Sequence, residues 1–300
     1  MGSFGGHALP GSFFIIFGMW WTLQISVRYY RARYRKGPAY RSTATFLCSC
    51  LCGRLATWQI EGFLKIFFTT VGLTGEIITG FNDKGEFQNI GNGQHATMFF
   101  IFGLSGLVDI LLHHKVSLPK NFDYIVSLIA FAIEGILFNF HLHGRQPMDI
   151  QLHILLVYTI VANVITILTE LRWPRNVLCA YARAYFVILQ GTWFWQVGFI
   201  LYNPTPGAVK WDEDDHEQMM ITTIMFGWHM ILILVSMMIT SLVIGCIVRR
   251  GAPPGVEKDD EVALAQLIKK DANGQTFVCL NEESDSDMEY ERPLQNGSQN

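Results

Sequence analysis

The chain has 300 residues, of which 50% are hydrophobic and only 16% are Asp, Glu, Lys or Arg. This charged fraction lies well below the roughly 25% of a soluble domain, and the mean hydropathy is +0.27, so lipid is the expected main solvent. The net charge is −3 and no groove rich in Lys and Arg is evident, which argues against nucleic acid as a partner.

Seven apolar segments follow one another along the chain. A helix needs about 20 mostly apolar residues to cross roughly 30 Å of hydrocarbon. Because the apolar runs are continuous rather than alternating, each predicts a helix and not a barrel strand. We therefore expect an all-α, polytopic membrane protein with a seven-helix transmembrane domain over residues 1–250. The predicted spans are 9–29, 58–80, 95–113, 122–142, 149–171, 177–202 and 218–248.

Basic residues are distributed unevenly between the two sets of connections. One set carries clusters of Lys and Arg in every loop, whereas the other carries only Lys84, Arg145 and Lys210. Short cytosolic loops of membrane proteins carry the excess of Lys and Arg. The pattern predicts a lumenal or extracellular amino terminus and a cytosolic carboxyl terminus.

The composition changes beyond the seventh span. Residues 251–300 predict a disordered, acidic cytosolic tail in which a short amphipathic helix around 258–270 is the one local element that could form. Ser284 and Ser286 each precede an acidic residue by three positions, and phosphorylation would add roughly −1.5 to −2 charges per site. Two interpretations stay open: the tail engages cytosolic sorting machinery, or it is solvated and inert.

Three cysteines precede the second span, and none of the six in the chain lies in a predicted lumenal loop. Thiols next to a membrane are typical sites of S-palmitoylation, so modified and unmodified thiols are both consistent with the pattern. The candidate residues are Cys48, Cys50 and Cys52.

Several strings within residues 1–250 resemble the transmembrane protein 45 family. They are GHALPGSFFIIFGMWW, HATMFFIFGLSGLVDI, HLHGR, QGTWFWQVGFILY and DHE. The resemblance implies an integral seven-span protein of the trans-Golgi, endosome, lysosome or plasma membrane, without an established catalytic activity. It brings no mechanism and does not extend beyond Gly251.

Six of the nine histidines are predicted near the lumenal surface. A zinc site needs three or four ligands from different helices, and imidazole also titrates across the pH range of the secretory and endosomal compartments. Interfacial side chains without a shared role, a zinc site and a pH-sensing cluster all remain open. The candidate metal ligands are His95, His141, His153 and His216.

Glu134 lies near the middle of the fourth span, where an ionised carboxylate is costly and acidic residues usually mark function. We expect it to interact, directly or through water, with His229, which lies at a comparable depth in the seventh span. The alternative is a protonated Glu134 that forms a hydrogen bond with Gln190 or Asn163. Asn139, later in the fourth span, is a further buried polar candidate.

Other polar and small residues have simpler interpretations. Glu61 and Lys65 are four residues apart and are expected to pair, and Lys65 and Arg183 are expected to reach toward the cytosolic interface. The strings GLTG and GLSG, together with Ala180 and Ala184, predict close helix packing.

Three functions fit these features. The sequence favours a non-enzymatic trafficking or partner-binding factor with a lumenal-side histidine and glutamate site for a metal ion or a proton, and it leaves homo-oligomers open. An intramembrane metal-dependent lipid hydrolase would need an open metal position to activate water. A proton- or metal-coupled transporter is the third, although no inverted repeat is evident.

Overall fold

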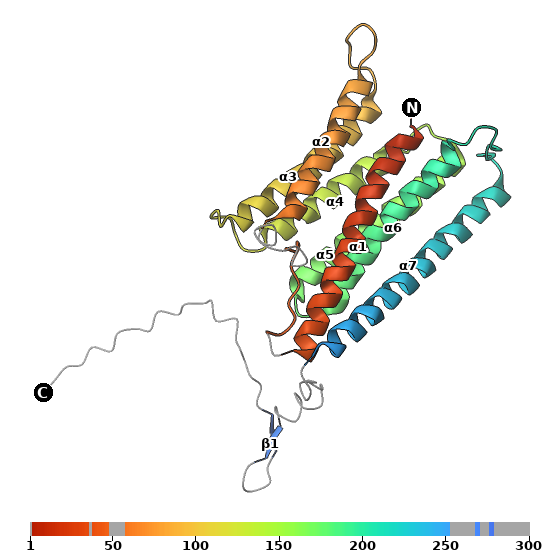
Figure 1. The fold of residues 1–300 in the computed structure, drawn as a ribbon. Helices are drawn as coiled ribbons and strands as arrows, with labels where there is room; N and C mark the ends of the chain where they lie inside the picture. Colours follow the sequence, from red (N-terminus) through yellow and green to blue (C-terminus); the bar gives the residue numbers. More distant parts are fainter. Residues whose placement is uncertain (1, 36–37, 48–57, 253–267, 271–275, 279–300) are drawn as a thin grey trace, which may run out of the picture. The chain divides into compact units, whose positions relative to one another are not determined.

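The computed structural model describes residues 2–35, 38–47, 58–252, 268–270 and 276–278 (Figure 1). Each of the seven predicted spans corresponds to one α-helix in these residues, and all seven are long and apolar enough to cross a membrane. The predicted all-α fold is therefore confirmed. The helices are α1 (Phe4–Tyr34), α2 (Ile60–Gly80), α3 (Ile90–His113), α4 (Phe122–Phe140), α5 (Pro147–Arg172), α6 (Val177–Leu201) and α7 (His216–Arg250).

Several helices begin earlier than the hydropathy predicts because polar side chains cap them. The Ser3 hydroxyl accepts a hydrogen bond from the backbone of Gly6, and α1 begins at Phe4 rather than near residue 9. Asn89 caps α3 and Asp215 caps α7 in the same way. A cap satisfies backbone N–H groups that would otherwise lack partners, so polar residues lengthen apolar helices.

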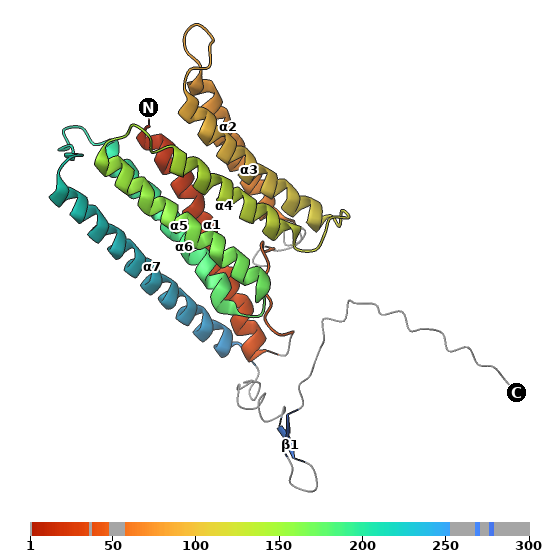
Figure 2. The same cartoon turned by 180° about the vertical axis from the view of Figure 1, so that it is seen from behind.

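The helices do not all pack to the same extent. α1 packs most closely on α6, which also contacts α5, whereas α2 pairs with α3 and joins the others mainly through α3 and α4 (Figures 1 and 2). Contact between α1 and α2 is slight although they are consecutive in the chain. The α2–α3 pair is therefore attached to the other helices chiefly where α3 packs on α4.

Glycines allow the closest helix contacts. A Cβ atom added to Gly191 would lie 2.7 Å from the carbonyl oxygen of Gly11, and one added to Gly106 would lie 2.8 Å from that of Gly62. Small residues let helix backbones approach in this way within membranes. The expected packing at GLSG is confirmed at Gly106. At GLTG it is confirmed for Gly72, where an added Cβ would meet the Phe99 ring of α3, but not for Gly75, where nothing lies within 4 Å of such an atom.

Residues 253–300 form a separate unit. Its described part is a two-stranded antiparallel hairpin of β1 (Ile268–Lys270) and β2 (Thr276–Val278), in which Ile268 pairs with Val278. Residues 268–270, at the end of the amphipathic helix expected around 258–270, are therefore extended. The tail candidates Ser284 and Ser286 lie outside the described residues, as do Cys48, Cys50 and Cys52.

Candidate functional site

A cavity extends between α1, the α2–α3 pair, α4 and α6. About 1120 Å³ of space is unfilled by atoms when its open side is counted. Polar side chains line the end where α1 begins, and Lys65 and Trp21 line the opposite end. Aromatic rings form most of the wall between them, from residues Phe13, Phe14, Phe17, Phe68, Phe99, Phe102, Phe131, Phe138 and Phe194.

His141 is held at the polar end of the cavity by two neighbours. Its Nδ1 lies 2.6 Å from the Gln94 side-chain oxygen, and its Nε2 contacts the Arg145 guanidinium. Because a guanidinium only donates, Nε2 accepts and Nδ1–H donates to Gln94, which fixes a neutral tautomer. Burial, followed by the nearby Arg145 charge, lowers the pKa of His141 to about 3. Both ring nitrogens are therefore occupied within the protein.

Three more histidines line the same end. His153 Nδ1 forms a hydrogen bond with the backbone carbonyl oxygen of Asp149 at 2.9 Å and lies 2.7 Å from one carboxylate oxygen of the same residue. The other carboxylate oxygen accepts from Arg145 at 2.7 Å. His95 Nδ1 lies 3.3 Å from Glu76. The His7 ring lies 5.8 Å from that of His153, between centroids. Acidic partners thus orient His95 and His153.

Only three of the four candidate metal ligands lie close together. The rings of His95 and His153 lie 5.2 Å and 6.2 Å from that of His141, whereas His216 is the exposed first residue of α7 and does not line the cavity. No three His, Cys, Asp or Glu side chains among the described residues are grouped to hold a metal ion. The polar end accordingly fits hydrogen bonding better than metal coordination.

Glu134 is the most enclosed acid of the cavity wall, with 2% of its surface exposed. The Gln190 side chain donates to its Oε1 at 2.7 Å, and its Oε2 has no hydrogen-bond partner. The alternative expectation, a bond to Gln190, is therefore the one that the structure contains.

Glu134 and His229 do not contact each other directly. The His229 Nε2 atom lies 3.4 Å from the Gln196 side-chain oxygen, and its ring lies 5.6 Å from that of Trp193. The bulk of the Trp193 side chain, which is fully buried, occupies the interior next to His229. Asn139 is exposed rather than buried, because it lies one residue past Phe138 and off the buried face of α4.

Aromatic rings close the gap between α1 and α2. Phe13 of α1 stacks on Phe68 of α2 with centroids 4.4 Å apart, and Phe17 contacts Phe68 edge-on at 6.4 Å. The slight contact between these two helices means that these rings, rather than backbone packing, separate the cavity from the bilayer on this side.

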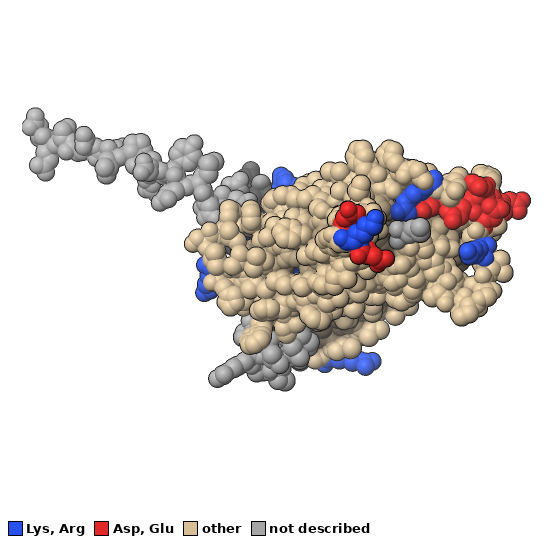
Figure 3. Space-filling model, turned by 90° about the horizontal axis from the view of Figure 1, so that it is seen from above, with Lys and Arg blue, Asp and Glu red and all other residues tan. Residues whose placement is uncertain are grey.

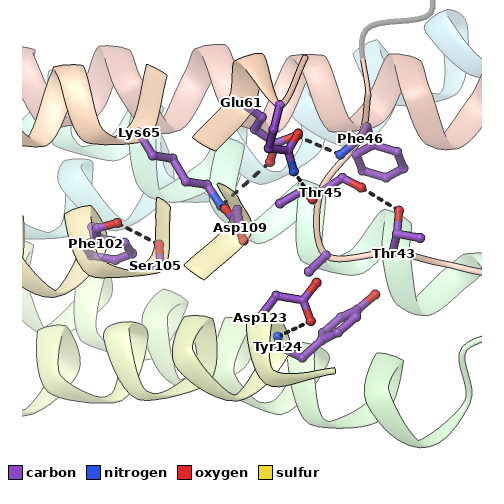
Figure 4. A network of polar contacts seen from close by, with 12 residues as sticks. Thr43, Thr45, Phe46, Glu61, Lys65, Phe102, Ser105, Asp109, Asp123 and Tyr124 are labelled. Carbon is purple, nitrogen blue, oxygen red and sulfur yellow. Dashed lines mark hydrogen bonds and ion pairs between the residues drawn. The ribbon is translucent and has the colours of Figure 1, made fainter. Parts of the chain in front are cut away.

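A second polar network lies toward the opposite end, where residues 38–47 contact the bundle (Figure 4). Glu61 accepts from the Trp21 indole at 2.7 Å and from the backbone of Phe46 at 3.0 Å. Lys65 lies 2.7 Å from Asp109 and 3.8 Å from Glu61, which confirms the expected Glu61–Lys65 pair and adds a partner. The network ties α2 and α3 to the segment after α1.

Arg183 does not reach toward the interface as expected; it is 3% exposed and forms an ion pair with Glu170 at 2.6 Å. Its guanidinium also donates to the backbone carbonyls of Thr43 and Ala44. The Tyr124 hydroxyl donates to Glu170 at 3.1 Å. A counter-ion in the interior holds Arg183 there, since a buried charge needs a partner.

Sequence reasoning missed this pair. The sequence feature that could have identified it is a pair of opposite charges, Glu170 and Arg183, in consecutive spans joined by the short turn of residues 173–176. An antiparallel hairpin brings such residues within reach of each other.

The surface at the end where α1 begins is mostly uncharged (Figure 3). Lys and Arg are sparse on this face, and acidic side chains gather in two places. The basic clusters of Arg31, Arg33, Lys115, Arg172 and Arg250 belong to the opposite helix ends. The alternation of seven helices therefore places the unequal charges at opposite ends of the bundle.

Comparison with known proteins relates the chain to other membrane proteins. Residues 120–242, which include Glu134, Glu170, Arg183 and Gln190, match a group described as "Family of unknown function (DUF716)". The chain is similar to Transmembrane epididymal protein 1 of Rattus norvegicus, with 24% identity over 98% of this chain and 97% of the relative.

Two further relatives carry related names. Transmembrane epididymal protein 1A of Mus musculus is 24% identical over 98% of this chain and 97% of its own length. Transmembrane epididymal protein 1 of Homo sapiens is 27% identical over 60% of this chain and 69% of its own. Together with the seven apolar helices, these similarities support an integral, multi-pass membrane protein.

Proposed function

We propose that this chain is a non-enzymatic membrane protein that acts by binding, and that its cavity takes up an amphipathic molecule dissolved in the bilayer. The observation that carries the proposal is the Glu134 Oε2 atom, which is buried in the cavity wall without a partner. Ligand sites are concave and mostly apolar, with a few polar groups that fix orientation, and this cavity has that composition.

The ligand enters from the membrane between α1 and α2. Helix contact is slight there, and Phe13 and Phe68 can change rotamer without breaking a hydrogen bond. The apolar part of the ligand then lies against the phenylalanine wall, and its polar part contacts Glu134.

The remaining parts of the proposal rest on the sequence. Membership of the transmembrane protein 45 family, residence in secretory or endosomal membranes and a trafficking role follow from the resemblance and from the acidic tail. A lumenal amino terminus follows from the distribution of Lys and Arg. Under this orientation the histidine end of the cavity faces the lumen.

A metal-dependent hydrolase is less well supported, because no three His, Cys, Asp or Glu side chains of the described residues converge to hold a metal ion. Zinc binding at this end remains a prediction of the sequence, and elemental analysis of the purified protein tests it.

Photoaffinity labelling tests the binding proposal. The protein in lipid vesicles is exposed to photoreactive long-chain alcohols and amines, and the labelled residues are mapped by mass spectrometry. Ser127→Phe fills the cavity from α4, whereas Ile129→Phe places the same side chain at an outward position of that helix. Labelling of cavity residues must fall in the first variant and persist in the second. Equal labelling in both would refute the proposal.

A further inference from the structure

The chemistry around Glu134 identifies the class of ligand, and this inference rests on the proposed binding function. Among the described residues, no Lys, Arg or His lies within ion-pair distance of its carboxyl group, in contrast to Glu61, Asp109, Asp149 and Glu170. Gln190 satisfies one oxygen only. Glu134 is thus a buried acid of the cavity wall, and one of its oxygens has no hydrogen-bond partner.

Phenylalanine rings line the same cavity as Glu134. Phe131 and Phe138 lie three residues before and four residues after Glu134, so that they flank it on the same face of α4. Phe102 packs edge-on against Phe131 at 5.1 Å, and Phe194 packs against Phe138 at 5.7 Å. The Phe14 ring contacts Phe102, Phe131 and Phe194, and we call these five linked rings of the cavity wall the phenylalanine cage.

We propose that the cavity binds an amphipathic amine, such as a long-chain base, whose ammonium group pairs with Glu134 inside this phenylalanine cage. The faces of aromatic rings attract cations, by about 0.5–2 kcal/mol for each well-placed ring. A hydroxyl group would satisfy the open oxygen but would gain nothing from the rings, and a fatty acid would place a second acid beside Glu134.

The proton balance favours the same ligand class. An isolated ionised carboxylate is costly in such a site, so Glu134 is protonated before a ligand binds. A neutral amine arriving from the bilayer takes the proton of Glu134 onto its nitrogen, which leaves an ammonium and a carboxylate in contact. No net charge crosses the apolar wall, and the new pair gains a charge-assisted hydrogen bond.

Competition binding tests the inference. A long-chain amine and the alcohol of the same chain displace a bound fluorescent amphiphile from the protein in vesicles. We expect the wild-type protein to prefer the amine by about 10- to 100-fold, the range of one charge-assisted hydrogen bond. Glu134→Gln must abolish this preference while leaving alcohol affinity nearly unchanged, and Glu134→Asp must retain part of it.

Glu76→Gln is the matched control, because Glu76 is also an acid of the cavity wall but already pairs with His95. It must leave the amine preference intact. Equal affinity for amine and alcohol in the wild-type protein, or an unchanged preference in Glu134→Gln, would overturn the inference while the binding function stands. Displacement by neither compound would refute the binding function itself. Thermal melting of each variant shows that it is folded.

Discussion

Replacing Arg183 by Met removes the cation from an enclosed ion pair of the bundle. The side chain of Glu170 is fully buried and lies 2.6 Å from the guanidinium, which also holds the carbonyl oxygens of Thr43 and Ala44. Met has a similar length and apolar character but leaves the Glu170 carboxylate without its counter-ion. The segment before α2 loses two hydrogen bonds at the same time.

The expected cost follows from these contacts. Removing one partner of a buried ion pair typically destabilises a protein by about 3–5 kcal/mol, because the other charge stays buried and uncompensated. Replacing both partners by apolar residues is often neutral or stabilising. The double variant Arg183→Met with Glu170→Leu is therefore expected to recover at least ~2 kcal/mol relative to Arg183→Met alone.

Reversible unfolding of the protein in mixed detergent micelles, followed by circular dichroism, measures these differences. Arg172→Met is the control, since Arg172 is exposed at the end of α5 and its loss should change stability by no more than ~0.5 kcal/mol. The reasoning is refuted when Arg183→Met costs no more than this control. It is also refuted when the loss of unfolding free energy in the double variant equals the sum of the losses in the two single variants.

Three further outcomes are expected. Gly191→Ala forces α6 from the backbone of α1 and should lower the free energy of unfolding by about 1–3 kcal/mol, whereas Gly75→Ala, which meets nothing, should not. The pKa of His141 is lowered from 6.5 to about 3, so the unfolded chain takes up the proton first and stability should fall as the pH drops below 6.5. His141→Gln should reduce the difference in melting temperature between about pH 7 and about pH 5, and the exposed His143→Gln should not. Phe68→Ala should accelerate release of a bound amphiphile in stopped-flow measurements because it opens the side between α1 and α2, while Phe68→Leu should not.

Much of the fold could be predicted because lipid imposes one rule on every span. A continuous apolar run must be helical to satisfy its backbone, so seven runs predict seven helices. The ends were less predictable, since hydropathy does not register a cap such as Ser3 or Asn89. Which helices pair was not predictable either: α1 packs on α6 because Gly11 and Gly191 permit close approach, and glycine spacing alone does not name its partner.

The site was predictable in its residues more than in its contacts. Glu134 was identified because an acid in mid-span is unusual, but its partner depends on the rotation of α4 against α6 and α7. The same uncertainty separated His216 from the other three candidate ligands, because depth in the membrane does not fix which side of a helix bundle a residue faces. Arg183 was misjudged because a long side chain near a helix end can turn outward or inward, and only the position of Glu170 decides this.

The pairing of the first helix with the sixth has a consequence for biosynthesis. Gly11 meets Gly191 across that contact, and a ribosome adding about 5–20 residues per second needs about 10 to 40 seconds to make the chain between them. During that interval Gly11 of the nascent first helix lacks its packing partner. The hydrogen bonds from Arg183 to the carbonyl oxygens of Thr43 and Ala44 have not formed either. The pairing of α1 with α6 can therefore form only in about the last third of translation. Until then the partly synthesised chain is a suitable substrate for a chaperone within the membrane.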